Sequence, residues 1–372
     1  MVLITTGDEY SLVHKKLFSK ICVFTEKFIY FKRFIRIMRF KQRVKSDKKV
    51  KLDLKDMKII YWLCQNGRLS YTDLAKKVSL STDAIIYRIK NLEKNGIIQG
   101  YVTVTDIAKL GFTTYHLFLQ LTQVNENIRD KVIETLRVYP FIKVIIEFSG
   151  KYDFEIGIAS RTVTEADEYI QKIIDSVAAY LQQYIVLTIS NYYFTHTVPR
   201  NFFYIPHESE IRKHSAVSVD ETDLKILQIL SENARAKLYE IGNKVTLSSD
   251  AINYRIKNLQ KSDVIVKYAP ILNYTLLGYT VYAVLMNIFP LSKEKDKTLK
   301  YFLESNENIL WAVKTLGIYN LLMYVCVKSS DELHLTLLKM RELFSKEIKE
   351  YETIIAYEEY VYTYFPVICS RT

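Results

Sequence analysis

Two segments of the 372-residue chain carry the same polar and basic side chains at the same spacing. Residues 80–94 read LSTDAIIYRIKNLEK, and residues 247–261 read LSSDAINYRIKNLQK. In each segment apolar residues recur at positions i, i+4 and i+7, a period that predicts a helix with one buried face. Hydroxyl, amide, ammonium and phenol groups share the other face, and such groups contact base edges and phosphates when a helix enters the major groove of DNA.

The buried stripe and the exposed face of this predicted helix can be assigned residue by residue. The apolar stripe consists of Ile85, Ile89 and Leu92 in the first segment and Ile252, Ile256 and Leu259 in the second. The residues expected to contact DNA are Ser81, Thr82, Asp83, Ile86, Tyr87, Arg88, Lys90, Asn91 and Lys94, together with Ser248, Ser249, Asp250, Asn253, Tyr254, Arg255, Lys257, Asn258 and Lys261. The alternative is a solvated face of a small helical bundle, but its recurrence in both segments favours DNA contact.

Two arginines of this set have a second interpretation. Arg88 and Arg255 lie near the edge of the buried stripe. Each therefore suits an ion pair with an acid of the first predicted helix, such as Asp56 or Asp223, about as well as it suits a DNA phosphate.

Both segments belong to an internal repeat. Residues 52–113 align without gaps on residues 219–280, with about 26 identical positions, far above chance. Two predicted helices precede the segment in each copy, at residues 55–66 and 71–77 and at residues 222–233 and 238–244. A short turn follows, and Ser81 or Ser248 can cap the third helix by accepting from free amide groups at its start. This order, followed by a connecting strand, is typical of a winged helix-turn-helix unit.

After each helix-turn-helix the predicted order is strand, helix, strand, strand, helix, strand. These elements lie at residues 115–121, 127–138, 142–148, 154–159, 164–180 and 186–194, and at residues 281–288, 293–305, 309–315, 321–327, 331–346 and 353–364. The order is that of a ferredoxin-like β-α-β-β-α-β unit, so the expected fold class is α+β. Because the strands are apolar on both faces, we expect the two sheets to pack face to face as a pseudo-dimer, in one eight-stranded sandwich.

The repeat divides the chain into six segments. The stretch between the copies has two prolines and no periodicity, which indicates a linker. The segments are a basic amphipathic extension (1–50), helix-turn-helix domain 1 (51–104), ferredoxin-like domain 1 (105–198), the linker (199–217), helix-turn-helix domain 2 (218–271) and ferredoxin-like domain 2 (272–368).

The net charge of +11 is poor support for DNA binding. Residues 1–50 carry about 13 Lys and Arg against about 4 Asp and Glu, so most of the excess lies outside the repeats. Apolar residues at helical spacing between residues 17 and 38 predict a basic amphipathic helix, for which an anionic membrane surface and DNA phosphates are candidate partners. The preferred interpretation is that Met38 is a candidate natural start and that the preceding residues are poorly ordered.

The first helix-turn-helix ends in YRIKNLEKNGIIQGYV, and the domain after it contains GKYDFEIGI. Together with the order of elements, these motifs resemble the Lrp/AsnC family of transcription regulators over nearly the full length of both copies. The resemblance implies a DNA-binding domain, followed by a domain that dimerises and often senses an amino acid or a related small molecule. It also implies a candidate effector loop, the family's Gly-x-x-Asp turn, at Gly150, Tyr152 and Asp153 and at Gly317, Tyr319 and Asn320.

The second copy departs from the family's pattern in this loop. Asn320 replaces the carboxylate found at Asp153 with an amide. The loss of charge weakens any site that holds an amino group by an ion pair. The competing interpretation is that the loop is only a turn that connects two strands.

An enzyme is the main alternative, because some relatives of this family decarboxylate tetrapyrroles with paired sheet domains. Candidate catalytic residues are scarce. The six histidines show no metal-ligand spacing; they are His14, His116, His196, His207, His214 and His334. The second copy has Ala283 and Thr363 where the first has His116 and His196, and a histidine on a strand is more often packed in the core than catalytic.

The remaining composition excludes other classes of site. The four cysteines are too far apart for a zinc or dithiol motif; they are Cys22, Cys64, Cys326 and Cys369. Lys and Arg interrupt every apolar stretch before it reaches the roughly 18 residues that a membrane span needs. We therefore expect no catalytic residue, no metal and no cofactor other than a small-molecule effector, and a reducing, cytoplasmic compartment.

The expected partners are double-stranded DNA and, within the chain, the other repeat, with further self-association left open. The exposed helix faces differ between the copies, since Asn253 replaces Ile86 and Ser249 replaces Thr82. Local charge also falls from about +4 to about +1. We therefore expect two unequal half-sites rather than a perfect palindrome. An interaction module that has lost DNA binding is disfavoured, because both faces keep their basic and polar residues.

Overall fold

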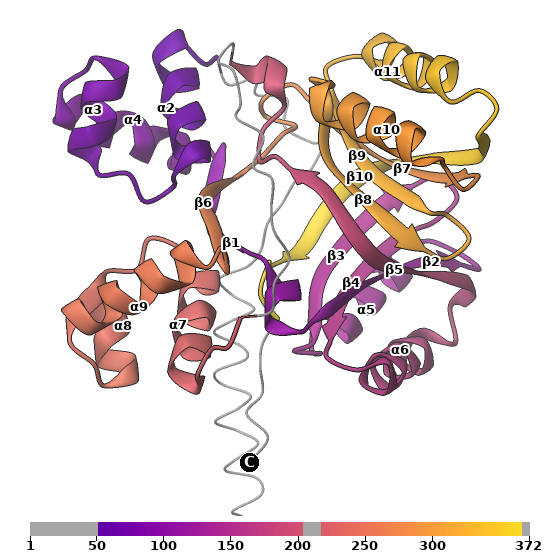
Figure 1. Cartoon of the computed structure of the whole chain (residues 1–372), viewed down its shortest axis with the longest axis horizontal. Helices are drawn as coiled ribbons and strands as arrows, with labels where there is room; N and C mark the ends of the chain where they lie inside the picture. Colours follow the sequence, from indigo (N-terminus) through magenta and orange to yellow (C-terminus); the bar gives the residue numbers. More distant parts are fainter. Residues whose placement is uncertain (1–50, 204–216, 367–372) are drawn as a thin grey trace, which may run out of the picture. The chain divides into compact units, whose positions relative to one another are not determined.

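The computed structural model describes residues 51–203 and 217–366. The basic extension at residues 1–50 and most of the expected linker lie outside the described residues. Within the described ranges, each copy folds into three helices, a connecting strand and a β-α-β-β-α-β unit (Figure 1). The expected α+β fold class is confirmed, whereas the domain boundaries drawn from the sequence stay a prediction.

The first helix-turn-helix begins each of its helices at a side-chain cap. Its elements are α2 (Leu54–Gln65), α3 (Tyr71–Val78), α4 (Thr82–Lys94) and the strand β1 (Ile98–Thr105). The side chains of Asp53, Ser70 and Ser81 each accept a hydrogen bond from an amide of the first turn. Helix α3 ends at Ser79 in the left-handed region, with φ of 57°, and this residue makes the tight turn into α4.

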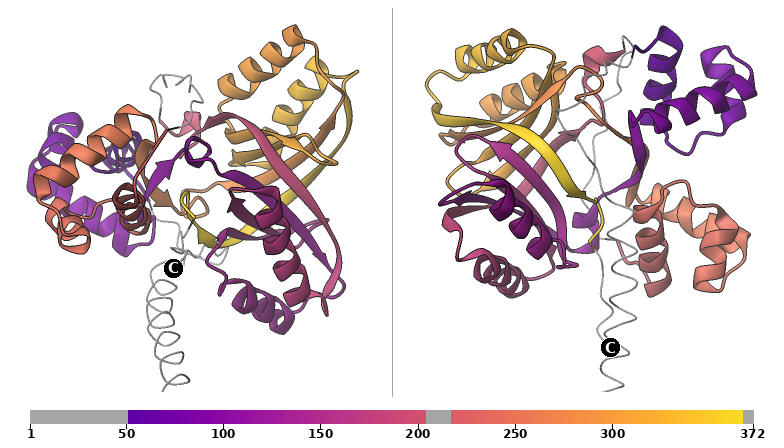
Figure 2. Two further views of the ribbon diagram at one scale, coloured as in Figure 1. Left: turned by 60° about the horizontal axis from the view of Figure 1, so that its bottom comes forward. Right: turned by 180° about the vertical axis from the view of Figure 1, so that it is seen from behind.

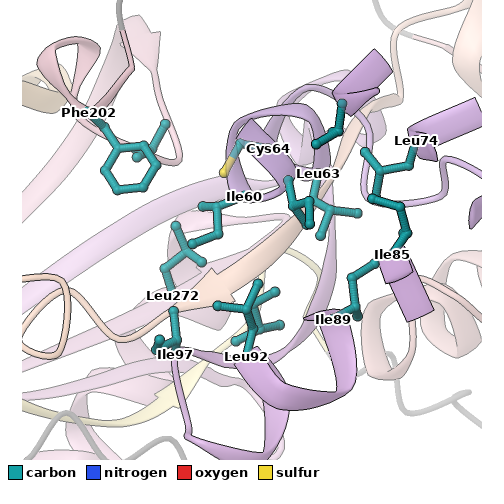
Figure 3. Packing of buried hydrophobic residues seen from close by; sticks show 14 of the residues in the cluster. Ile60, Leu63, Cys64, Leu74, Ile85, Ile89, Leu92, Ile97, Phe202 and Leu272 are labelled. Carbon is teal, nitrogen blue, oxygen red and sulfur yellow. The ribbon is translucent and has the colours of Figure 1, made fainter. Parts of the chain in front are cut away.

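Apolar side chains from all three helices form the core of this unit. Leu63, Leu74 and Ile85, from α2, α3 and α4, are all fully buried in one cluster (Figure 3). Leu272 of the second copy and Phe202 of the segment between the copies belong to the same cluster. Residues outside the first copy thus complete the core of its helix-turn-helix.

The second helix-turn-helix repeats this construction. Its elements are α7 (Glu221–Glu232), α8 (Leu238–Val245), α9 (Ser249–Lys261) and the strand β6 (Ile265–Leu272). Leu230, Ile241 and Ile252 lie in its core, and Ile107 of the first copy packs in the same cluster. Ile107 belongs to the short 3-10 helix η1 (Ile107–Leu110).

Strands β1 and β6 pair antiparallel and form a ribbon that joins the two units. Tyr101 lies opposite Pro270, and Thr103 lies opposite Tyr268. Helix α2 contacts β6, and helix α7 contacts β1. Each helix-turn-helix therefore rests on the strand that belongs to the other copy.

Each sheet domain contains four strands and two helices in the expected order. The first consists of β2 (Thr113–Leu121), α5 (Glu126–Leu136), β3 (Ile142–Ser149), β4 (Phe154–Ser160), α6 (Val163–Val177) and β5 (Leu181–Thr195). The second consists of β7 (Thr280–Ile288), α10 (Lys293–Ser305), β8 (Ile309–Leu316), β9 (Leu321–Val327), α11 (Ser330–Leu343) and β10 (Ile348–Tyr362). A further 3-10 helix, η2 (Arg200–Phe202), begins the segment between the copies.

The two sheets close into one barrel, with strand order β10-β3-β4-β2-β5-β8-β9-β7 (Figure 2). The expected sandwich differs from this barrel at two edges, where β5 pairs with β8 and β10 pairs with β3. Strands β5 and β10 are each 15 residues long, so each reaches beyond its own sheet to a second partner. Closure pairs backbone groups that two open sheets would leave free at their edges.

The barrel has separate apolar layers inside and outside. Phe118, Phe148, Leu285 and Leu322 belong to the inner layer, where the two sheets meet. Helices α5 and α6 pack on the outer face of the first sheet, and α10 and α11 pack on that of the second (Figures 1 and 2). Both faces of β2, β4 and β9 are therefore covered by apolar side chains, which explains why these strands lack polar alternation.

Candidate nucleic-acid interface

Helices α4 and α9 present the side chains that the sequence predicts to contact DNA. Ser81 and Ser248 cap them by accepting from Ala84 N and Ala251 N, each at 3.2 Å, as expected. The predicted stripes are buried in both helices. The exposed residues of the set are Ser81, Asp83, Tyr87, Lys90, Asn91 and Lys94, and Ser248, Ser249, Asp250, Tyr254, Lys257, Asn258 and Lys261. Thr82, Ile86, Arg88, Asn253 and Arg255 are half-buried.

Two tyrosines stand out on these faces. Tyr87 is 72% exposed and Tyr254 is 68% exposed, and they occupy equivalent positions in the two copies. Exposure of a large aromatic ring at both positions forgoes the stabilisation that burial would give. The rings, with the flanking lysines and asparagines, are therefore available to a partner on the outer face of each helix.

Arg88 and Arg255 form the ion pairs that were the alternative to a phosphate contact. Arg88 Nη1 lies 2.8 Å from Asp53 Oδ2 and 2.7 Å from Asp56 Oδ1. In the second copy Arg255 Nη1 lies 2.7 Å from Asp220 Oδ2, and its second partner is Asp223. The amide of Asp56 and the guanidinium of Arg88 hold the pKa of Asp53 below its usual range. Each arginine thus ties the exposed helix to the start of the first helix of its unit.

Reciprocal backbone bonds hold the two helix-turn-helix units to the ribbon. Gly67 N donates to Tyr268 O at 2.7 Å, and the equivalent Ala234 N donates to Tyr101 O at 3.2 Å. The two backbones approach closely at Gly67, where an added Cβ would lie 3.1 Å from the amide nitrogen of Ala269. The loop between the first two helices of each unit is therefore fixed to the other copy's strand.

Two arginines strengthen this junction. Arg68 Nη1 donates to Ala234 O at 2.6 Å, and its guanidinium lies over the ring of Tyr268, 5.3 Å from the centroid. The equivalent Arg235 lies over the ring of Tyr101 at 4.8 Å. Cation–π contacts of this kind add to the backbone bonds. Nothing in the local sequence pattern marks these residues as a junction, although both arginines follow the first helix at matching positions.

The candidate effector loop forms a strand-connecting turn in both copies. Asp153 Oδ2 accepts from Leu121 N at 2.7 Å, and Asn320 Oδ1 accepts from Ile288 N at 2.9 Å. These bonds are equivalent, because Leu121 and Ile288 occupy matching positions of the repeat. Burial raises the pKa of Asp153, and the bond from the Leu121 amide opposes that rise. The carboxylate and the amide thus make the same backbone contact.

The loop tyrosines point into the protein rather than toward solvent. Tyr152 and Tyr319 are each 1% exposed and belong to the inner layer of the barrel. Gly150 and Gly317 have φ of 148° and 146°, in the region that favours glycine. Lys151 Nζ, from the same loop, reaches Tyr319 Oη at 3.2 Å and Glu352 Oε1 at 2.9 Å in the other copy. An effector at this loop stays a prediction.

The described histidines do not form a metal site. His116 is buried on β2, its Nδ1 contacts a carboxylate oxygen of Glu155, and the same carboxylate accepts from the hydroxyl of Tyr324. His334 is exposed on α11, while His14, His207 and His214 lie outside the described residues. Across residues 51–203 and 217–366, no three His, Cys, Asp or Glu side chains gather where they could hold a metal ion.

Two further findings concern cysteines and membranes. Cys64 and Cys326 are buried as free thiols, and burial raises the pKa of Cys64 to about 12. Cys22 and Cys369 lie outside the described residues. No helix in the described ranges is both long and apolar enough to cross a bilayer.

Known proteins resemble this chain in sequence. Residues 52–99 match a model for winged helix-turn-helix DNA-binding domains, and residues 219–260 match a model for AsnC-type helix-turn-helix domains. The regulatory protein AsnC of Haemophilus influenzae is 30% identical over 139 residues, which cover 91% of that protein and 37% of this chain. The chain belongs to the Lrp/AsnC family of transcriptional regulators.

Other Lrp/AsnC relatives match a similar length. The HTH-type transcriptional regulator FL11 of Pyrococcus abyssi is 33% identical over 118 residues, covering 77% of that protein and 32% of this chain. The transcriptional regulator AzlB of Bacillus subtilis is 30% identical over 127 residues, covering 79% of that protein and 34% of this chain. Most of a relative therefore aligns with about one third of this chain, as expected for an Lrp/AsnC unit present in two copies.

One solved structure resembles nearly the whole Lrp/AsnC chain. The siroheme decarboxylase NirDL has a TM-score of 0.56 and 11% identity, and the match covers 85% of this chain and 94% of that one. At this identity the likeness concerns the fold. It shows that this overall fold also occurs in another protein.

Proposed function

We propose that this Lrp/AsnC-type regulator binds double-stranded DNA sequence-specifically by placing α4 and α9 against two unequal half-sites. The observation that carries the proposal is the pair of exposed faces, alike in their Tyr, Lys and Asn residues and different at two positions. Those positions are Ile86 against Asn253 and Thr82 against Ser249. An isoleucine offers a base only apolar contact, whereas an asparagine can donate and accept hydrogen bonds at an adenine edge.

The basic residues of each face supply the affinity common to both half-sites. Lys90 and Lys94 are exposed on α4, and Lys257 and Lys261 are exposed on α9. Ammonium groups on such a face neutralise phosphates and release counterions, so binding weakens as salt rises. The higher local charge of the first copy supports a stronger phosphate contact there.

Selection of bound sequences from random DNA, followed by footprinting at physiological salt, tests the proposal. The expected operator is an imperfect palindrome with one half-site for each copy. Its two symmetrised versions, each built from one half-site repeated, should bind more weakly than the natural order. Equal affinity for both symmetrised palindromes contradicts unequal reading, and the absence of any protected sequence contradicts DNA binding itself.

We further infer that a small molecule modulates DNA binding, as the family resemblance implies for its sheet domains. Two places could receive it, the loop around Asp153 and a cavity beside the ribbon. An enzyme of the tetrapyrrole-decarboxylase type is the weaker candidate. The observation in its favour is His116, which lines that cavity in contact with a carboxylate. A purified protein without a visible absorption band, and without turnover of a tetrapyrrole, argues against the enzyme.

A further inference from the structure

A cavity of about 190 Å³ lies between the ribbon and one end of the barrel. All eight barrel strands and both ribbon strands contribute residues to its lining. The volume is enough for roughly six water molecules, or for a small organic molecule in their place. The walls are largely apolar, with Val104, Ile146, Ile271 and Leu310 among them.

Charged groups stand out against this apolar lining. Lys143 is 7% exposed, and no described residue gives its ammonium group a hydrogen bond or an ion pair. Burial lowers the pKa of Lys143 to about 8. Burying an ammonium group without a partner destabilises the folded protein. The presence of Lys143 therefore indicates a role other than stabilising the fold.

Four acidic side chains line the same cavity, at Asp106, Glu155, Glu358 and Glu359. Glu155 is 1% exposed and contacts His116 and Tyr324, and Glu359 lies on β10. Burial, and the proximity of Glu155, raise the pKa of Glu359 to about 8. Glu155 on β4 and Glu359 on β10 are both paired with Ile146 of β3, so they occupy one rung of the sheet on either side of that residue.

Irregularities in the strands accompany these charged residues. Ile142 pairs with Ile158 and Val144 pairs with Gly157, so Lys143 is an extra residue of β3 relative to β4. Strand β10 has register shifts on both sides of Glu358 and Glu359. A bulge re-aims a side chain that regular alternation would send to the other face. Lys143 lies three residues along β3 from the carboxylate rung, a separation of about 10 Å along the strand.

Aromatic rings surround the acidic side of the cavity. The ring of Trp311 lies 5.6 Å from that of His116, 5.4 Å from that of Tyr324 and 6.4 Å from that of Tyr192, centroid to centroid. An aromatic face beside carboxylates attracts an organic cation through its quadrupole and through charge. The side of the cavity near Lys143 instead offers a positive charge.

The repeat shows that the fold does not need these groups. The second copy has Leu310, Leu322 and Ala283 at the positions of Lys143, Glu155 and His116, and all three are buried. The same strands therefore pack with apolar side chains in one copy and with charged or polar ones in the other.

We propose that the cavity binds a small zwitterion whose ammonium and carboxylate groups are several bonds apart. The carboxylate pairs with Lys143, and the ammonium group lies near Glu155, the ring of Trp311 and Glu359, whose carboxyl group releases its proton to solvent when the ammonium group binds. An ω-amino acid and a short peptide have this arrangement of charges. The site is separate from the loop around Asp153, whose side chain bonds the backbone of Leu121.

The cavity also touches the ribbon through Val102, Val104 and Leu272. Because the ribbon holds both helix-turn-helix units, an occupant that shifts it changes how α4 and α9 meet two half-sites. This consequence for regulation rests on the proposed DNA-binding function. Occupancy of the cavity itself does not.

Calorimetric titration of the full chain without DNA tests the site. The probe is 6-aminohexanoate, and hexylamine and hexanoate are the matched molecules that each carry one of its two charges. We expect saturable binding of the zwitterion, at least about tenfold tighter than that of either analogue, because each charge gains a buried partner. No binding of the zwitterion, or equal binding of the three, overturns the proposal.

Three variants locate the bound zwitterion. Lys143→Met should bring 6-aminohexanoate down to the affinity of hexylamine, and Glu359→Gln should bring it toward that of hexanoate. Lys151→Met removes an exposed ammonium group of the loop near Asp153 and should leave binding unchanged. Binding that survives Lys143→Met but is lost in Lys151→Met places the ligand at the loop and overturns the proposal. Denaturant unfolding checks that each variant is folded.

A DNA-binding assay with and without 6-aminohexanoate forms a separate arm. If calorimetric binding is present and the protein shows no sequence-specific DNA binding, the cavity site stands while the proposed function fails. If the protein binds DNA sequence-specifically but shows no calorimetric binding of 6-aminohexanoate, the proposed function stands and the cavity site fails.

Discussion

The amide of Gly67 donates a hydrogen bond to the carbonyl oxygen of Tyr268 over 2.7 Å. Gly67 belongs to the first helix-turn-helix, and Tyr268 belongs to the ribbon strand of the second copy. The same bond recurs between Ala234 and Tyr101. The two helix-turn-helix units are thereby fixed to each other through the ribbon, so the distance between α4 and α9 is a property of the fold.

Insertion of DNA between the half-sites tests this relationship. Adding about 5 base pairs turns one half-site to the opposite side of the duplex, and adding about 10 restores its facing. Because the ribbon fixes the two units, we expect affinity to fall after the first insertion, with partial recovery at most after the second. Gel shifts with the three operators measure this. Equal affinity for all three operators would show that the units move independently.

Loss of one lysine from each exposed helix should weaken DNA binding without unfolding the protein. In the Lys90→Ala and Lys257→Ala variants we expect the slope of log affinity against log salt to decrease by about 1 each, since each removes one phosphate contact. The matched control is Lys172→Ala on α6, an exposed lysine on the outer face of the sheet domain. An unchanged slope in both helix variants would show that these lysines do not contact phosphates.

Replacement of Arg88 should act on stability more than on phosphate contact. The guanidinium is held by Asp53 and Asp56 at 2.8 and 2.7 Å. Arg88→Ala removes both pairs and is expected to lower the free energy of unfolding by roughly 1 kcal/mol, a modest value because the group is partly exposed. Thermal unfolding of this variant, beside Lys90→Ala, measures the difference. A variant with unchanged stability and a lower salt slope would assign Arg88 to DNA.

Asp153 provides a test that uses the repeat as its control. Asn320 already makes the equivalent bond in the second copy, so Asp153→Asn should keep stability close to that of the wild type. Asp153→Ala leaves the amide of Leu121 unpaired and should cost about 1–3 kcal/mol. Denaturant titration gives both values. If Asp153→Asn also abolishes a response to an amino acid, the loop has a ligand role beyond the turn.

Lys143 predicts a dependence of stability on pH. Its pKa is about 8 in the folded chain and near 10.5 when unfolded, so between these values the unfolded chain binds the proton more strongly. The contribution of this group to the unfolding free energy is therefore most unfavourable below about pH 8 and rises toward zero as pH increases to 10.5.

Lys143→Leu, which introduces the residue found at Leu310, removes this penalty. We expect the variant to be more stable than the wild type by about 3 kcal/mol at pH 7, with the advantage shrinking above pH 8. Urea unfolding of both proteins at pH 7 and pH 10 checks the sign. A wild type that loses stability relative to the variant as pH rises from 8 to 10 contradicts the assignment.

The elements and most of the exposed helix faces could be predicted from the sequence because they depend on local periodicity and on the repeat. Helices α10 and α11 show how accurately the bounds of a helix could be predicted. The former was expected at its observed bounds, and the latter was expected to continue to residue 346, although it ends at Leu343. Phe344, which follows its last residue, is fully buried in the core of the second sheet domain, and no local stop signal marks this position in the sequence.

Closure of the barrel could not be predicted in the same way. The pairing of β5 with β8 and of β10 with β3 joins residues far apart in the sequence, and it depends on the extra length of two strands. Lys143 did give a signal, because it interrupts the apolar run Phe141 to Ile146. Without the fold, nothing indicated that its side chain shares a cavity with Glu155 and Glu359.

The pairing of β5 with β8 and of β10 with β3 bears on how DNA binding depends on the concentration of the protein. A regulator assembled from separate subunits must associate before it can occupy two half-sites, so its activity falls faster than its concentration at low copy number. Here both halves lie in one polypeptide, and β5 and β10 pair across them, so the barrel formed by the described strands has no open edge at which halves could exchange. Under the proposed DNA binding, operator occupancy should not depend on the association of separate halves, and a single codon change should alter the contacts of one helix-turn-helix unit while those of the other are kept.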